Sequence, residues 1–234
     1  MASFRDTTEE SKLAWERNAD FWDQSMGDES NYFHRNIVRP RTEELLNIEK
    51  GDHVLDIACG NGNFSERLVE MGATVVAFDY SENMIKHAKK RRQRVLDSVQ
   101  FIQCDATDYN QLISLKKERL FDKAVANMAI MDISDIDPLL RAVNELLCAG
   151  GSFVFSTHQP CFERPEGQYL TPWVHKGAAI EGQPFLQNYY HRSLQDLFQA
   201  CFNAGFAMDG LFEESMDQSE FPVIMIVRLR KWNP

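Results

Sequence analysis

The residues best suited to chemistry in this chain lie in one turn that carries two glycines. The segment 56–62 reads DIACGNG and begins within the last half of a predicted strand at 53–58. Glycine lets a backbone bend tightly and approach a ligand closely, and the N–H groups of a following helix can bind polar ligand atoms. The segment therefore predicts a ligand site, although Gly60 and Gly62 could also serve the turn alone.

Polar side chains also follow the next three predicted strands. Asp79 comes directly after the run 74–78, Asp105 follows 99–103, and Asn127 ends the fourth strand. Because the carboxyl ends of parallel strands meet at one edge of a sheet, we expect these side chains to lie near the glycine turn. A carboxylate at position 79 suits a ribose diol, in an NAD site as well as in other nucleoside sites, and Asp105 suits an adenine amino group.

Short apolar runs alternate with amphipathic stretches along the chain, which is typical of βαβ units around a parallel sheet. Strands are predicted at 53–58, 74–78, 99–103, 121–126, 151–157 and 222–230, with a weaker one at 207–213. Helices are predicted at 11–23, 41–48, 63–71, 82–96, 108–118, 138–148 and 193–204.

The domain organisation that we expect is one sheet with two additions. Residues 1–50 form a helical cover that belongs to the same domain, and residues 51–234 form the core. The segment at about 160–190 holds too many prolines and glycines for a core element, so we interpret it as an insertion over one end of the sheet. Long insertions in compact domains are commonly functional.

These motifs resemble those of the class I S-adenosylmethionine-dependent methyltransferases, in the broad bacterial group that acts on small molecules. The resemblance covers about residues 30–234 and implies an α/β, three-layer Rossmann-like fold. The sheet would be mostly parallel and seven-stranded, with an antiparallel C-terminal strand. Ala58 replaces the first glycine of the family's acid-x-Gly-x-Gly-x-Gly signature, which narrows the backbone approach.

The resemblance also implies S-adenosylmethionine as the cofactor. Its methionine part would lie at segment 56–62, its ribose at Asp79 and its adenine at Asp105. The residues carried over as cofactor-binding are Tyr32, Arg35, Asp56, Ala58, Gly60, Asn61, Gly62, Asp79, Tyr80, Met84, Asp105, Ala106, Asn127, Met128, Ala129 and Asp132. Arg35 suits the methionine carboxylate, because a guanidinium binds a carboxylate bidentately. The neighbouring His34 equally suits the solvated start of a surface helix.

The reaction implied is methyl transfer to an oxygen or nitrogen acceptor on a small molecule. Transfer is an in-line displacement, so the protein mainly aligns the reactants in a site closed to water. A general base is optional. His158 and His191 are the candidate bases, although His158 could only satisfy local hydrogen bonds and His191 could only precede a helix capped by Ser193.

Aromatic side chains of the insertion could cover the acceptor. Phe162, Tyr169, Trp173, Phe185, Tyr189 and Tyr190 lie within or at the end of this segment. They would either favour a flat acceptor and add cation–π stabilisation or merely pack the segment down. The cluster of Trp15, Phe21 and Trp22 is better interpreted as the apolar face of an amphipathic helix than as a substrate site.

Two alternative functions stay open. An NAD(P)-dependent oxidoreductase would also use a glycine turn and Asp79, but its fingerprint needs a glycine where this chain has Ser65. A non-catalytic module that only binds S-adenosylmethionine would keep the same motifs.

Composition limits the partners. Thirty-five acidic against 25 basic residues give a formal charge of −10, which disfavours nucleic acid. The basic run at 86–94 is interpreted as a solvated helix face, with an RNA-binding stripe as the alternative. We expect a small-molecule acceptor as partner and no membrane association, because no apolar stretch is long enough to span a bilayer. The sequence leaves the oligomeric state open.

The cysteines indicate the compartment. The chain has five, without regular spacing or a CxxC pair, so we interpret them as thiols of a cytoplasmic protein. No metal-ligand spacing is visible, and no metal is expected.

Overall fold

A seven-stranded sheet forms the centre of the protein, in a computed structural model that describes residues 4, 7–116, 119–162, 168–216 and 219–232. Its strand order is β3-β2-β1-β4-β5-β9-β8. The strands are β1 (His53–Ile57), β2 (Thr74–Asp79), β3 (Val99–Gln103), β4 (Phe121–Ala126), β5 (Leu147–His158), β8 (Phe206–Glu214) and β9 (Ile224–Lys231). The first five pair in parallel, whereas β9 runs antiparallel to both β5 and β8. The predicted mostly parallel sheet with an antiparallel C-terminal strand is confirmed.

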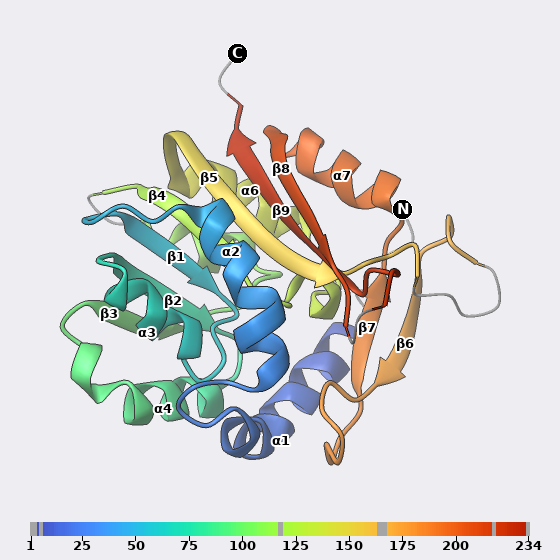
Figure 1. Ribbon diagram of the computed structural model, residues 1–234, viewed down its shortest axis with the longest axis horizontal. Helices are drawn as coiled ribbons and strands as arrows, with labels where there is room; N and C mark the ends of the chain where they lie inside the picture. The colour runs from blue at the N-terminus through green and yellow to red at the C-terminus, as the bar shows by residue number, and fades with distance from the viewer. Residues whose placement is uncertain (1–3, 5–6, 117–118, 163–167, 217–218, 233–234) are drawn as a thin grey trace.

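Helices cover both faces of this sheet (Figure 1). They are α1 (Thr8–Met26), α2 (Arg39–Leu46), α3 (Asn63–Glu70), α4 (Glu82–Arg91), α5 (Tyr109–Ile113), α6 (Asp137–Leu146) and α7 (Leu194–Asn203). Shorter helical segments are η2 (His34–Val38), η3 (Gln93–Val95) and η4 (Ile130–Asp132). One buried cluster joins the sheet to α5, α6 and α7, and a second joins it to α2, α3 and α4. These three layers are the predicted architecture.

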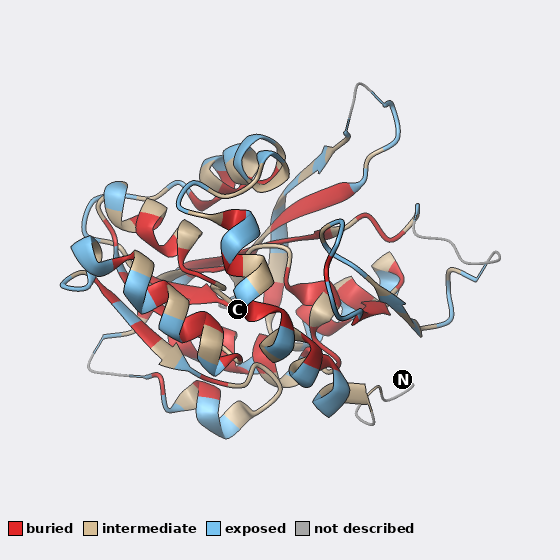
Figure 2. Ribbon diagram, turned by 90° about the horizontal axis from the view of Figure 1, so that it is seen from below, coloured by how far each residue is buried: buried red, intermediate tan, exposed pale blue. Residues whose placement is uncertain are grey.

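The apolar runs form strands because both faces of the sheet are buried. Successive side chains of a strand point to opposite faces. In β1, Leu55 and Ile57 belong to one cluster and Val54 to the other, and β2 divides in the same way. Strands covered on both sides need continuous apolar sequence rather than alternation. Figure 2 shows the resulting buried band along the sheet and the inward sides of the helices.

Several predicted bounds differ from the structure. The helix predicted at 82–96 ends at Arg91 and continues as η3, and the helix predicted at 108–118 reduces to α5, with 117–118 outside the described residues. The weak strand at 207–213 is confirmed as β8.

The segment at 160–190 differs most from its prediction. Its described part contains an antiparallel pair, β6 (Trp173–Gly177) and β7 (Gln187–His191). All five residues of β7 are buried, so the expectation that this segment holds no core element is wrong for β7. The physical reason is that β7 packs against α1 and η4.

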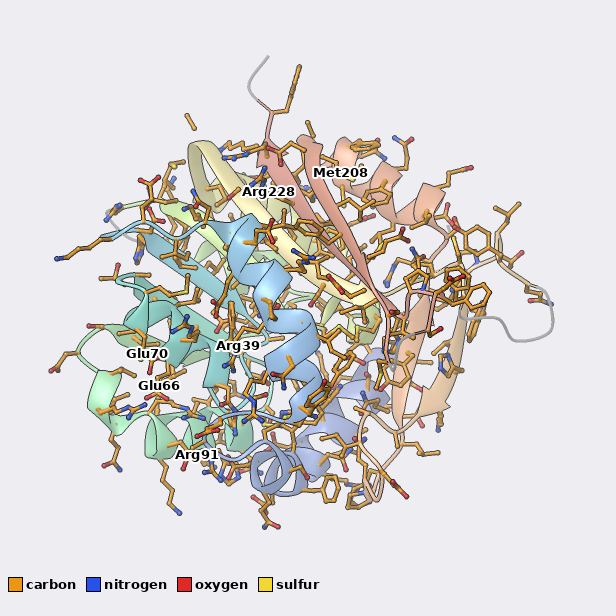
Figure 3. All side chains as sticks on the ribbon, in the orientation of Figure 1. Arg39, Glu66, Glu70, Arg91, Met208 and Arg228 are labelled. Carbon is orange, nitrogen blue, oxygen red and sulfur yellow. The ribbon has the colours of Figure 1, made fainter. Side chains whose placement is uncertain are left out.

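Helix α1 lies across the end of the sheet to which the parallel strands point (Figure 1). The basic run at 86–94 holds it there. Arg91, labelled in Figure 3, pairs with Asp23 of α1 and, at 2.8 Å, with Asp28. The interpretation of this run as a solvated face is therefore wrong for Arg91.

Arg92 from the same run is almost completely buried, at 2% exposure. Its Nη1 donates to Glu66 Oε2 at 2.8 Å, its Nη2 to the carbonyl of Gly27 at 3.2 Å, and its Nε to the carbonyl of Asn61 at 3.3 Å. One guanidinium thus connects α3, the glycine turn and the end of α1.

Within the described residues, no helix combines the length and the apolar composition that crossing a bilayer requires.

Replacing Arg92 tests this connection. We expect Arg92→Ala to lower the free energy of unfolding by about 3 kcal/mol, because it removes the donor to Glu66 Oε2 and to the carbonyls of Gly27 and Asn61 and leaves the buried Glu66 with Arg94 alone. Lys90→Ala, an exposed position in the same basic run, should change it by less than about 0.5 kcal/mol. Urea denaturation measures both, and equal small effects would show that Arg92 does not hold α1.

Candidate active site

A cavity of about 890 Å³ lies at the carboxyl edge of the sheet, beneath α1. We call it the main cavity; α1, η2, η4 and the ends of β1, β2 and β4 contribute to its walls. A second cavity of about 570 Å³, the adjoining cavity, lies over the glycine turn. The two cavities share Trp22, His34, Ala58, Gly60 and Asn127, which we call the seam.

The glycine turn requires an unusual backbone. Ala58, Gly60 and Gly62 all have positive φ, at 53°, 55° and 76°. A β-carbon on Gly62 would lie 2.8 Å from the Phe101 ring, and one on Gly60 would lie 3.5 Å from Trp22 Nε1. Gly60 lines both cavities, whereas Gly62 lines neither. At position 62 only glycine leaves room for the Phe101 ring. Ala58 keeps the left-handed conformation without glycine, at a cost of about 1–2 kcal/mol.

Asp79 stands at the end of β2 and connects to this turn. Its Oδ2 accepts the Gly60 N–H at 2.9 Å, and its Oδ1 accepts the Ser81 N–H at 2.9 Å. Burial raises the pKa of Asp79 to about 6, against the effect of these backbone N–H groups. The carboxylate lines the main cavity with lone pairs left for a ligand.

Asp56 lines the adjoining cavity and is more deeply buried, at 2% exposure. Its Oδ2 accepts a hydrogen bond of 2.5 Å from Ser65 Oγ. Burial raises the pKa of Asp56 to about 7, and the negative charge of Asp79 adds to the rise. Asn61 also lines this cavity and donates to Asp23 of α1 at 3.0 Å.

Asp105 marks the far end of the main cavity. Lys12 of α1 pairs with its Oδ2 at 2.5 Å, while the backbone and hydroxyl of Thr107 donate to its Oδ1. The same lysine lies 5.2 Å from the centroid of the Tyr80 ring. Met84 and Ala106 complete this end, which therefore combines one ion pair with flat and apolar surfaces.

The loop after β4 closes the main cavity from another side. Asn127, Met128, Ala129 and Asp132 all line it. Asn127 Oδ1 accepts from the Thr42 hydroxyl at 3.1 Å, which leaves the amide nitrogen as the group available to a ligand.

Besides Gly62, two predicted cofactor residues lie outside both cavities. Tyr32 is 67% exposed, and Arg35 pairs with Glu29 at 2.9 Å on the surface. His34 and Arg39 line the cavities instead. The π-helical turn of η2 sets which residues of this segment face inward, and a sequence pattern read at α-helical spacing does not show it. Figure 3 labels Arg39 at the start of α2.

The candidate bases His158 and His191 line a third cavity of about 270 Å³, which shares no lining residue with the other two in the described chain. His191 Nε2 lies 2.8 Å from the carbonyl oxygen of Tyr169, and its ring stacks on Trp173 at 5.0 Å. Their catalytic role stays a prediction. Among the described residues of the insertion, none lines the main or adjoining cavity.

Helix α1 supplies the site residues that the sequence did not reveal. Trp15 and Trp22 line the main cavity, with their ring centroids 5.1 Å apart in an edge contact, so this face of the helix borders a cavity. Ser11 also lines it, and its buried hydroxyl makes no hydrogen bond within the described part of the chain. The spacing of Ser11, Trp15 and Trp22 along one face of the helix was the available signal.

Comparison with known proteins identifies the class first. The solved structure of an S-adenosylmethionine-dependent methyltransferase of Mesorhizobium loti superposes on this chain with a TM-score of 0.61 at 23% sequence identity. The match covers 82% of this chain and 96% of that one. The 1,6-didemethyltoxoflavin-N1-methyltransferase of Burkholderia thailandensis gives 0.65 at 19% identity, over 95% and 90%. The fold is therefore the Rossmann-like fold of these methyltransferases.

The sequence then identifies the family. Residues 48–201 match the methyltransferase domain family, and the chain belongs to it. A ubiquinone biosynthesis O-methyltransferase of Coxiella burnetii is 32% identical over 122 residues, which are 52% of this chain and 50% of the relative. The chain thus spans about half the length of the curated relatives it matches.

The glycine turn yields a stability prediction. Gly62→Ala should lower the free energy of unfolding by about 2–4 kcal/mol, from the left-handed conformation plus the clash with Phe101. Gly150 has nearly the same φ, at 75°, with nothing within 4 Å of an added β-carbon. Gly150→Ala should therefore cost only about 1 kcal/mol. Equal losses in chemical denaturation would contradict the packing role.

The buried carboxyl of Asp56 yields a pH prediction. A carboxyl whose pKa is higher in the folded than in the unfolded state binds more protons when folded, so its contribution to stability falls as pH rises. For Asp56 this window runs from about 4 to about 7. Asp56→Asn should therefore gain stability relative to wild type across that window, measured by urea denaturation at each pH. A difference between the two proteins that does not change with pH would show that Asp56 is not buried in this way.

Proposed function

We propose that this protein transfers a methyl group from S-adenosylmethionine to an oxygen or nitrogen atom of a small molecule. The observation that carries the proposal is the pair of adjoining cavities that meet at the glycine turn, with Asp79 on one side and Asp56 on the other. A ligand with a nucleoside at one end and an amino acid at the other fits this division. The membership in the methyltransferase domain family supports the same conclusion.

The nucleoside half of the cofactor fits the main cavity. Asp79 would accept hydrogen bonds from the two ribose hydroxyls. Backbone N–H groups hold its carboxylate in place, and lone pairs on both oxygens remain for the ligand. Tyr80 and Met84 offer a flat and an apolar surface for the adenine. Asp105 would receive the adenine amino group beside Lys12.

The amino-acid half fits the adjoining cavity. Arg39 takes the role predicted for Arg35, because Arg39 lines this cavity and a guanidinium suits a carboxylate. Asp56 and Asn61 contribute a carboxylate and an amide oxygen for the ammonium group. The sulfur would then lie at the seam, near Ala58 and Asn127.

The cofactor supplies an electrophilic methyl group on a sulfonium, and the chain's own residues position it and exclude water. The carboxyl groups that line the two cavities outnumber the basic groups: they belong to Asp56, Asp79, Asp105 and Asp132, compared with Lys12 and Arg39. This excess of acidic groups favours a cationic ligand. Trp15 and Trp22 cover the main cavity with aromatic surface, which limits hydrolysis and aligns the acceptor.

The acceptor that this site suits is a small molecule. The main cavity lies beneath α1, whose Trp15 and Trp22 line it, so the helix limits the size of an acceptor that can enter. Arg91 and Arg92 of the basic run serve internal ion pairs rather than a nucleic-acid surface. A cytoplasmic location is part of the proposal, and the free thiols of all five cysteines are consistent with it.

Isothermal titration calorimetry with S-adenosylhomocysteine and with NADH tests the proposal. We expect the first to bind and the second not to bind, because Ser65 occupies the position of the third dinucleotide glycine and is hydrogen-bonded to Asp56. Tight NADH binding without a response to S-adenosylhomocysteine would favour an oxidoreductase. Cofactor binding without turnover of any phenol, alcohol or amine would favour a non-catalytic module.

The role of Asp79 has its own test. Asp79→Asn keeps an acceptor for the Gly60 N–H but removes the charge, so affinity for S-adenosylhomocysteine should fall by about 1.5–3 kcal/mol. Asp97→Asn, at an exposed position, is the matched control and should bind as wild type does. An unchanged affinity in Asp79→Asn would show that the ribose lies elsewhere.

A further inference from the structure

The seam contains one side chain to which the cofactor assignment gives no role. Of its five residues, Ala58 and Gly60 belong to the turn, and Asn127 and Trp22 contribute an amide and an indole. His34 is the one titratable side chain among them. It stands at the start of the π-helical turn η2 and lines both cavities. Short π-helical segments occur frequently at functional sites.

The imidazole of His34 is neutral at physiological pH. Burial lowers the pKa of His34 to about 4, and the positive charge of Arg39 adds to the effect. The centroid of the His34 ring lies 6.0 Å from that of Trp22 and 5.5 Å from that of Phe33, and both contacts are edge-on. A neutral imidazole offers one nitrogen that accepts a hydrogen bond and one that donates.

The surroundings of His34 select the kind of molecule that can approach it. The carboxylates Asp56, Asp79 and Asp132 line the two cavities, so an anionic acceptor would be repelled. The Trp15 and Trp22 rings present aromatic faces and edges beside the same space, which suits a planar ring.

We propose that His34 is a catalytic residue that accepts a hydrogen bond from an uncharged, planar methyl acceptor carrying an O–H or N–H group. This inference rests on the proposed function, since it places the transferred methyl group at the seam. It assigns to His34 the part that the sequence suggested for His158 or His191, which line the third cavity.

The reaction balances with His34 as proton acceptor. A lone pair of the acceptor oxygen or nitrogen forms the bond to the methyl carbon, and the methyl–sulfur bond breaks with its electron pair left on sulfur. The acceptor heteroatom becomes far more acidic as this bond forms, so its proton passes to the free nitrogen of His34 and then to water. Strong basicity in the resting enzyme is unnecessary for this step.

A binding experiment tests the position of His34 without turnover. In protein labelled at histidine, S-adenosylmethionine and S-adenosylhomocysteine should shift the His34 ring resonances differently, because one places a positive charge at the seam and the other does not. His34→Ala, which also assigns the signal, should keep the affinity of wild type for S-adenosylhomocysteine within about twofold in calorimetry. Identical resonances in the two complexes would overturn the proposal, and failure of both ligands to bind wild type would overturn the proposed function itself.

A turnover experiment tests the chemical role. Wild type is assayed for S-adenosylhomocysteine release with a panel of neutral phenols and NH-heterocycles and a matched panel of benzoates and aryl phosphates. We expect turnover within the neutral panel, and a fall in kcat/KM on the order of 100-fold in His34→Ala. His34→Gln, which keeps an acceptor oxygen, should recover part of this loss, and added imidazole should restore turnover to His34→Ala.

The matched control is His53→Ala. His53 lies at the start of β1, at the opposite end of the strands, with its ring stacked on Phe121, and its replacement should leave kcat/KM unchanged. The proposal is overturned if His34→Ala keeps wild-type kcat/KM, if it loses cofactor affinity in proportion to activity, or if the neutral panel gives no turnover.

Discussion

An acidic helix on an acidic sheet edge is the constraint on which this structure depends. Helix α1 carries Glu16 and Asp23 toward the edge of the sheet where β1 and β2 end, near Asp56 and Asp79. The like charges of these carboxylates repel one another and would push the helix away from the sheet. Three cations offset that repulsion. Lys12 of α1 pairs with Asp105, and Arg91 of α4 pairs with Asp23 of α1. Arg92 donates to the carbonyl of Asn61 in the glycine turn. These contacts help to hold α1 over the two cavities.

The same electrostatics prepare the site for its ligand. Lys12, Arg91 and Arg92 are engaged in ion pairs. Asp79 and Asp56, in contrast, have raised pKa values because burial outweighs their hydrogen bonds. A positively charged ligand compensates buried carboxylates better than a neutral one does. The left-handed turn at Ala58 and Gly60 stores some conformational strain, and such strain is common where a backbone is shaped for a ligand.

The sequence predicted the parts that follow from local patterns. The apolar runs located the strands, and the position of Asp79 directly after one of them placed it beside the glycine turn, as the structure confirms. The division into three layers follows from strands that are apolar on both faces.

The remaining site residues depend on long-range packing that no local pattern contains. Trp22 reaches the turn only because α1 folds back over the sheet, and His34 replaces Tyr32 and Arg35 at the cavities because η2 is a π-helix. Arg92 lies in a stretch whose composition is typical of a solvated surface. Its hydrogen-bond partners, however, are Glu66 and the carbonyl of Gly27, which are far away in the sequence. Charge count alone could not separate such a buried arginine from its exposed neighbours.

A crystal structure of the complex with S-adenosylhomocysteine tests the central claim most directly. The account predicts the adenosine in the main cavity with both ribose hydroxyls on Asp79, the amino-acid end in the adjoining cavity with Arg39, and the sulfur at the seam facing His34. A ligand whose ribose lies away from Asp79, or whose sulfur lies away from the seam, would contradict it.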